Sequence, residues 1–233
     1  WGAWGKTVLD STEVHSWSSN NKEAETKDDA GTFSKDSAAT KIYGQGDFDE
    51  GFEFNSDNAG DINKAPIAQD DKSKNKSYLK TDYTGSFDDK GLTLGKTAPI
   101  ARGWSWNFDG TALNPDNTNF GFTRSDIYQK FDNNIWSKSG LARLEVVISR
   151  GFSSNKNGQG RYEDDPNEGP QKAGDGSWNR SYTETNYKGC YKDSGAINPD
   201  HRPVVLDGYS QSYDGRNYSR SSIKQTFNID VWG

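Results

Sequence analysis

Aromatic and apolar side chains alternate with polar ones in several short runs of the chain. The alternation is clearest in residues 48–54, 104–109 and 223–231, and a shorter case covers residues 120–122. Because successive side chains of a β-strand point to opposite faces of its sheet, each run predicts a strand with one buried face of rings. Residues 144–148 are almost continuously apolar, which is typical of a central strand.

Turn-forming pairs separate these runs. Asp-Gly supplies the positive φ that tight hairpins require, and the chain has four such pairs between or beside the expected strands. They are Asp109-Gly110, Asp175-Gly176, Asp207-Gly208 and Asp214-Gly215. Short strands with this punctuation predict an all-β fold, an antiparallel β-sandwich of jelly-roll-like form. No internal repeat or linker interrupts the chain, so we expect a single domain over residues 1–233.

One stretch has the period of a helix instead. Ile127, Phe131 and Ile135 lie four residues apart, Thr123 or Ser125 can cap the start, and Gly140 follows the end. We therefore expect one short helix over residues 125–136, covering an edge or an end of the sandwich. Three long polar stretches are expected to be surface loops, namely residues 18–40, 55–77 and 153–177.

The composition indicates what fills the core. The chain has 8 Trp, 11 Tyr and 11 Phe but only 10 Ile, 8 Leu and 7 Val, a ratio opposite to that of ordinary globular domains. Rings at regular strand parity must therefore replace aliphatic side chains. We expect Trp104, Trp106, Phe48, Phe52 and Phe227 in the core. The other rings are available for binding or assembly, because aromatic side chains stack on sugars and anchor interfaces.

No catalytic signature is present, and no catalytic residue is predicted. The chain has one cysteine, Cys190, two histidines, no G-x-S-x-G nucleophile motif and no phosphate-binding loop. Glu145, between Arg143 and Arg150, is the strongest candidate for a functional carboxylate, although an outward-facing or Arg-paired glutamate is the simpler interpretation. An enzyme that cleaves polysaccharides would draw on Arg143, Glu145, His201, Arg202 and Tyr209.

Acidic clusters in turn-rich stretches make Ca²⁺ the one cofactor that the sequence suggests. Asp and Asn side chains, together with backbone carbonyls, can supply the oxygens that this ion prefers. The candidate metal site comprises Asp109, Asn114, Asp116 and Asn117. None of the acidic clusters matches the EF-hand loop, so a solvated loop without metal is the alternative.

Charge and the first residue bear on partners and location. The formal net charge is −6, and no stripe of Lys and Arg offsets it, which argues against nucleic acid as a partner. No apolar run is long enough to span a bilayer. The chain has no Met and begins with Trp1, which predicts an exported protein (extracellular, at the cell surface or periplasmic) that has lost a signal peptide.

The surplus rings suggest two functions. The first is a non-enzymatic structural subunit of an exported assembly, such as a filament, sheath, surface layer or particle, in which residues 1–17 dock on a neighbour. Its interface candidates are Trp1, Trp4, Trp17 and Trp232. The alternative is a carbohydrate-binding β-sandwich, with or without dependence on calcium, that stacks rings on a polysaccharide. Its stacking candidates are Trp178, Tyr209 and Tyr213.

Overall fold

The computed structural model describes residues 8–17, 73–111, 121–155, 160, 162, 169–225 and 227. Within this part of the chain lie eight strands and one helix, α2 (Asn133–Ser139). The strands are β1 (Ser11–Trp17), β2 (Lys74–Asp82), β3 (Ile100–Phe108), β4 (Phe122–Phe131), β5 (Leu144–Ser153), β6 (Trp178–Asn186), β7 (Val204–Tyr213) and β8 (Tyr218–Ser222). The expected all-β, antiparallel fold with a single short helix is confirmed.

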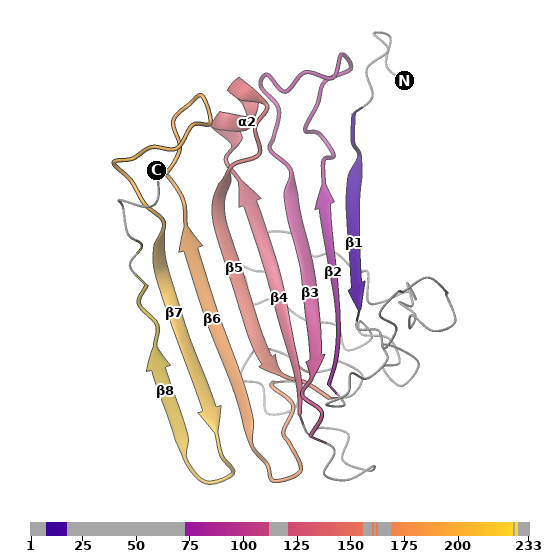
Figure 1. Cartoon of the computed structure of the whole chain (residues 1–233), viewed down its shortest axis with the longest axis vertical. Coiled ribbons are helices and arrows are strands. Elements are labelled where there is room, and N and C mark those ends of the chain that lie inside the picture. The colour runs from indigo at the N-terminus through magenta and orange to yellow at the C-terminus, as the bar shows by residue number, and fades with distance from the viewer. Residues whose placement is uncertain are drawn as a thin grey trace, which may run out of the picture.

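The eight strands form one sheet whose spatial order follows the chain from β1 to β8 (Figure 1). Each strand runs antiparallel to the next, so the sheet is an up-and-down meander. A jelly roll would need Greek-key connections that bring strands distant in sequence together. All pairings among the described strands join consecutive strands, so the sandwich and jelly-roll details have no support in this part of the chain.

One face of the sheet carries large side chains, and we call it the aromatic face. Residues directly opposite each other in antiparallel strands project to the same face, so the register aligns side chains into rows across the sheet. One such row consists of Tyr78, Trp104, Asp126, Arg150, Tyr182 and Tyr209. The next row in one direction contains Trp106, Arg124, Phe152 and Arg180. The next row in the other contains Arg102, Tyr128, Ile148 and Glu184.

The opposite face, which we call the hydroxyl face, carries two rows of small polar side chains next to a row that contains Leu79 and Ile127. One row crosses all eight strands and consists of Ser16, Ser77, Ser105, Ser125, Gly151, Ser181, Ser210 and Ser221. Its members are half-buried or exposed. The neighbouring row consists of Asn75, Asn107, Thr123, Ser153, Asn179, Ser212 and Ser219.

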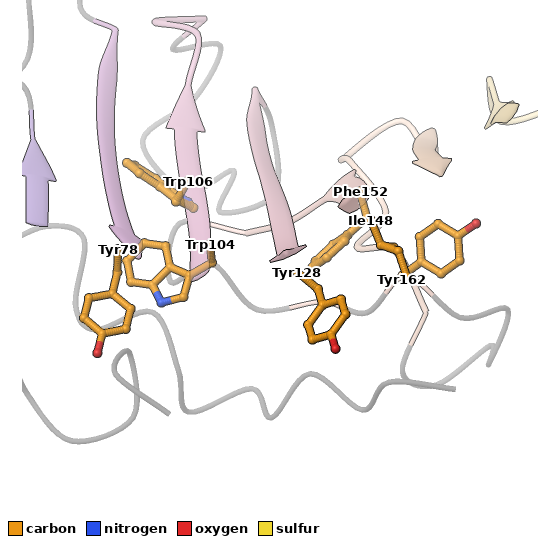
Figure 2. Close-up of a cluster of buried hydrophobic side chains, with 7 residues drawn as sticks. All are labelled: Tyr78, Trp104, Trp106, Tyr128, Ile148, Phe152 and Tyr162. Atoms are coloured by element: carbon orange, nitrogen blue, oxygen red, sulfur yellow. The ribbon is translucent and has the colours of Figure 1, made fainter. Parts of the chain in front are cut away.

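The core lies on the aromatic face. Its buried members are Tyr78, Trp104, Trp106, Tyr128, Ile148, Phe152 and Tyr162. Figure 2 shows Tyr78, Trp104 and Tyr128 projecting to the same side of the sheet. The expected burial of Trp104 and Trp106 is confirmed, with 3% and 0% of these residues exposed. Phe227 is half-buried, and Phe48 and Phe52 lie outside the described residues.

The helix exists, but its predicted position was wrong. Most of residues 125–136 belong to strand β4, and α2 begins after Asp132, whose carboxylate accepts hydrogen bonds from the amides of Asn134 and Ile135. Gly140 ends the helix in the left-handed conformation, as its place in the sequence suggested. The period of four arose by chance across the junction, because two of the three buried positions of β4 hold the charged side chains Arg124 and Asp126, and only the third, Tyr128, holds a ring.

Two further expectations about turns and loops need correction. Asp207-Gly208 lies inside β7 rather than at a turn. A side chain at Gly208 would meet Ile223, which runs alongside it, so the glycine serves close packing here. The expected loop 55–77 is wrong at its end, because its last four residues are the start of β2. Loops 18–40 and most of 55–77 lie outside the described residues, as does the alternating run 48–54.

The connections that the structure does describe agree better with expectation. Gly110, Gly176 and Gly215 all have positive φ, as predicted for the other three Asp-Gly pairs, and Asp214-Gly215 lies in the short connection between β7 and β8. The described residues of 154–177 contain no strand or helix, consistent with the expected loop. Within the described residues, no helix is long and apolar enough to cross a membrane.

Candidate binding cleft on the aromatic face

An open cleft of about 490 Å³ lies on the aromatic face over strands β4 to β7. Residues of three neighbouring rows line it, together with one residue from the connection between β5 and β6. The lining residues are Tyr128, Lys130, Val146, Ile148, Arg150, Tyr162, Tyr182, Glu184, Asp207 and Tyr209. Four tyrosines, two cations and two carboxylates therefore converge on one cavity.

Arg180 holds the one lining residue that does not come from a strand. Its Nη1 donates to the backbone oxygen of Tyr162 at 2.8 Å, and its Nε donates to Oε1 of Gln211 at 2.7 Å. The guanidinium carbon also lies 5.2 Å from the centre of the Tyr162 ring. Because Arg180 itself is buried in β6, this contact ties the β5–β6 connection to the sheet and fixes one wall of the cleft.

Arginines and tyrosines stack on one another along the cleft. The guanidinium of Arg150 lies 5.3 Å from the ring centre of Tyr162 and 5.8 Å from that of Tyr182. Tyr182 in turn stacks on Tyr209, with 5.8 Å between ring centres. Arg220 of β8 lies 4.6 Å from the centre of the Tyr209 ring. Each of these three tyrosine rings therefore packs against at least one neighbouring arginine. Cation–π contacts of this kind each contribute about 0.5–2 kcal/mol.

The phenol groups of the cleft are hydrogen bonded to one another and to a carboxylate. Tyr162 donates to the hydroxyl of Tyr209, and Tyr182 donates to Oε2 of Glu184 at 3.0 Å. Burial raises the pKa of Tyr162 and of Tyr182 above the usual value, and the acceptor beside each adds to the rise. Both groups therefore remain phenols at neutral pH, so they can donate hydrogen bonds but do not act as phenolate bases.

The charges of the cleft are mixed in sign. Nζ of Lys130 lies 3.1 Å from Oε2 of Glu145, and both side chains keep about a quarter of their surface exposed (27% and 22%). Glu184 and Asp207 line the same cavity as Arg150 and Lys130, and Asp207 is exposed. A cavity with balanced donors and acceptors suits a polar, hydroxyl-rich ligand better than a strongly charged one.

The three stacking candidates divide between this cleft and a second one. Tyr209 lines the first cleft, where Tyr182 and Arg220 flank its ring from the two adjacent strands. Trp178 and Tyr213 line a second cavity of about 420 Å³ at the other end of the sheet. There Tyr213 packs on Tyr218 of its own hairpin, with 4.5 Å between ring centres. The candidates therefore do not form a single platform.

The calcium prediction stays untested. Asp109 lies at the end of β3, where its carboxylate accepts hydrogen bonds from the amide and hydroxyl of Thr111. Asn114, Asp116 and Asn117 lie outside the described residues. Among the residues that the structure describes, no group of three or more His, Cys, Asp or Glu is placed to hold a metal ion.

Of the four tryptophans expected at an interface, only Trp17 lies within the described residues. Trp17 is the last residue of the edge strand β1. Trp1, Trp4 and Trp232 lie outside the described residues, so their role in assembly remains a prediction.

The residues proposed for a polysaccharide-cleaving enzyme do not converge. Of the five, Tyr209 alone lines the first cleft, and Glu145 only contacts its Lys130. Nε of Arg143 donates to the backbone oxygen of Gly195 at 2.7 Å. His201 contacts Asn198, and Arg202 donates to the backbone oxygen of Phe227. Arg143, His201 and Arg202 therefore make their hydrogen bonds to residues outside the strands and not to the cleft.

Sequence reasoning missed most of the cleft. Its key side chains on β6 and β7, Tyr182, Glu184, Asp207 and Tyr209, sit at alternate positions, which is the signal of one strand face. The intervening residues Thr183 and Gly208 are small, so β6 did not stand out by hydropathy. Comparison of the chain with models of known protein families, with curated proteins and with solved structures gave no match.

Proposed function

We propose that this protein binds carbohydrate in the cleft over β4–β7. The observation that carries the proposal is the convergence of four tyrosines, interleaved with arginine, on a cavity of about 490 Å³. This volume is in the range of small-ligand sites, which lie at about 300–1,000 Å³. Tyrosine suits sugars because its ring contacts apolar C–H groups while its hydroxyl exchanges hydrogen bonds.

The polar groups of the cleft favour neutral sugars. Hydroxyl groups of a sugar both donate and accept hydrogen bonds, and the cleft offers both kinds of partner. Arg150 and Lys130 donate, whereas Glu184 and Asp207 accept. A polyanionic glycan would meet two carboxylates at the same site, and a cationic ligand would meet two cations, so each is disfavoured by like-charge contacts.

Binding assays on Asp207 variants test the proposal. A glycan array, with and without Ca²⁺, identifies a ligand, and calorimetry then measures its affinity for Asp207→Ala. Asp207 is exposed, so its removal should leave the fold intact while costing about tenfold in affinity for the loss of one charged hydrogen bond. Asp89→Ala, also exposed but outside the cleft lining, is the matched control. An array without hits, or equal affinity of both variants, contradicts carbohydrate binding in this cleft.

A second function, that of a subunit of an exported assembly, is favoured by a different observation. Every residue of strand β8 at the edge of the sheet is exposed. An open strand edge is a template for pairing with another chain. This observation does not involve the cleft, so the two functions can coexist in one protein.

A further inference from the structure

The outer edge of β8 is available for pairing. β8 bonds to β7 on one side, and no other strand of the described chain pairs with it. Its five residues are all exposed, and Tyr218 keeps 76% of its surface in solvent. The ladder continues past the strand, because the amide of Ile223 donates to the backbone oxygen of Gly208 at 2.7 Å. The pairing with β7 therefore reaches Ile223, one residue beyond the strand, and Lys224 follows directly.

The segment 220–224 repeats the residue types with which β2 binds β1. Residues 76–80 of β2 read Lys-Ser-Tyr-Leu-Lys, and residues 220–224 read Arg-Ser-Ser-Ile-Lys. Four of the five positions match in kind, as a cation, a serine, a branched aliphatic residue and a lysine. Within the chain, residues 76–80 lie opposite Trp17, Ser16, His15, Val14 and Glu13 of β1. β8 thus offers to a neighbour the pattern that β1 already pairs with in its own sheet.

We propose that β8 of one copy pairs antiparallel with β1 of a second copy, with Ser221 opposite Ser16. In this register Ile223 lies opposite Val14, which is 50% exposed in the isolated chain. Lys224 occupies the position opposite Glu13, as Lys80 does within the chain. Apolar pairs and pairs of opposite charge are the cross-strand contacts that stabilise antiparallel sheets, each by about 0.2–1 kcal/mol.

The strand directions allow β8 and β1 of two copies to pair antiparallel while both copies keep the same orientation. The sheet has eight strands that alternate in direction, so β8 runs opposite to β1 (Figure 1). A second copy placed beside β8 in the same orientation therefore presents β1 antiparallel to it. The serine row of the hydroxyl face then continues across the joint from Ser221 to Ser16.

The proposed contact joins two different surfaces, and this has a consequence for the assembly. A contact between unlike surfaces leaves a free β1 at one end and a free β8 at the other, so it extends into a filament or closes into a ring. A symmetric dimer through β8 alone is less favourable. If it were centred on the middle of the strand, it would place Arg220 opposite Arg220, and like charges directly opposite each other destabilise a sheet.

Disulfide trapping between separate variants tests the register. Directly opposite residues of an antiparallel pair have Cα atoms about 4.5–5.5 Å apart, within the range that a disulfide spans. Mixing Ser221→Cys protein with Ser16→Cys protein and oxidising the mixture should give a covalent heterodimer. The native Cys190 is fully buried and does not compete. Ser219→Cys, two residues along the same face, is the out-of-register control and should give little product.

Sedimentation velocity supplies a second, independent measurement. The native chain should form species larger than the monomer as concentration rises, and Lys224→Glu should weaken this association about fivefold by facing Glu13 with a like charge. Lys188→Glu, an exposed charge reversal away from the edge, is the control. A monomer at every concentration without trapped heterodimer overturns the proposal, and so does a dominant Ser221→Cys homodimer. Neither result bears on carbohydrate binding, which the cleft variants test separately.

Discussion

The two faces of this sheet differ more in side-chain size than in polarity. The aromatic face carries rings, arginines and carboxylates, and the hydroxyl face carries mainly serine, threonine, asparagine and glycine, with a few aliphatic residues such as Leu79, Ile127 and Val147. Both are rich in polar atoms, yet only one forms a core. Arg124 and Asp126 keep 1% and 0% of their surface exposed, whereas the serines that alternate with them are half-buried or exposed.

The comparison teaches how a chain with few aliphatic residues can build a core. Rings provide the apolar area, and guanidinium groups stack on them instead of leaving gaps, as Arg124 does on Trp104 at 5.1 Å. Charge is tolerated because it is paired, with Nε of Arg124 lying 3.3 Å from Oδ1 of Asp126. Small hydroxyl side chains cannot bury comparable area, so the stability of the sheet rests mainly on one face.

Breaking the buried ion pair should have the largest effect. Asp126→Ala leaves the Arg124 charge buried without this partner, and we expect the free energy of unfolding to fall by about 3–5 kcal/mol. Ser125→Ala changes the adjacent residue on the hydroxyl face and should stay within about 0.5 kcal/mol of the native chain. Urea denaturation of both variants measures the difference. Equal decreases in the free energy of unfolding would show that the two faces contribute equally to stability.

Glycines on the hydroxyl face sharpen the comparison at an intermediate scale. A Cβ at Gly103 would clash with the backbone oxygen of Tyr78, which cannot move without distorting β2. We expect Gly103→Ala to cost about 1–3 kcal/mol, as overpacking does. At Gly151 the nearest atom is the Ser181 hydroxyl, at 2.7 Å, which can rotate away. Gly151→Ala should therefore cost less in the same denaturation assay, and the reverse order would mean that backbone spacing does not limit this face.

The contrast between the faces also explains what the sequence could predict. β3 was recognised because Trp104 and Trp106 alternate with Ser105 and Asn107, and β5 because its first half is apolar. β4 was mistaken for a helix because two of its three buried positions hold charged residues, Arg124 and Asp126. Hydropathy treats such residues as surface, while here pairing and ring stacking bury them.

The cleft was harder to predict than the strands. Tyr209 was selected as a ring for ligand stacking, but its neighbours on β4, β5 and β6 were not. A site of this kind is built from the register between strands, which brings Arg150, Tyr182 and Tyr209 into one row. Register depends on turn lengths and on which face is buried. Because β4 was predicted as a helix and β6 was not recognised, neither the turn lengths nor the buried face of these strands could be predicted.

The smallest expected effect concerns alkaline pH and distinguishes the buried phenols from exposed ones. The pKa of Tyr182 is raised in the fold above its unfolded value of 10.0, so its contribution to stability is complete below pH 10 and falls as pH rises beyond it. Tyr182→Phe removes this titration, so the free energy of unfolding should decline less steeply above pH 10 than in the native chain. Tyr218→Phe, at a residue that is 76% exposed, is the matched control for the loss of one phenol hydroxyl. Urea denaturation across this pH range measures the slopes. Identical slopes for all three proteins would mean that the aromatic face does not shield its phenols from solvent.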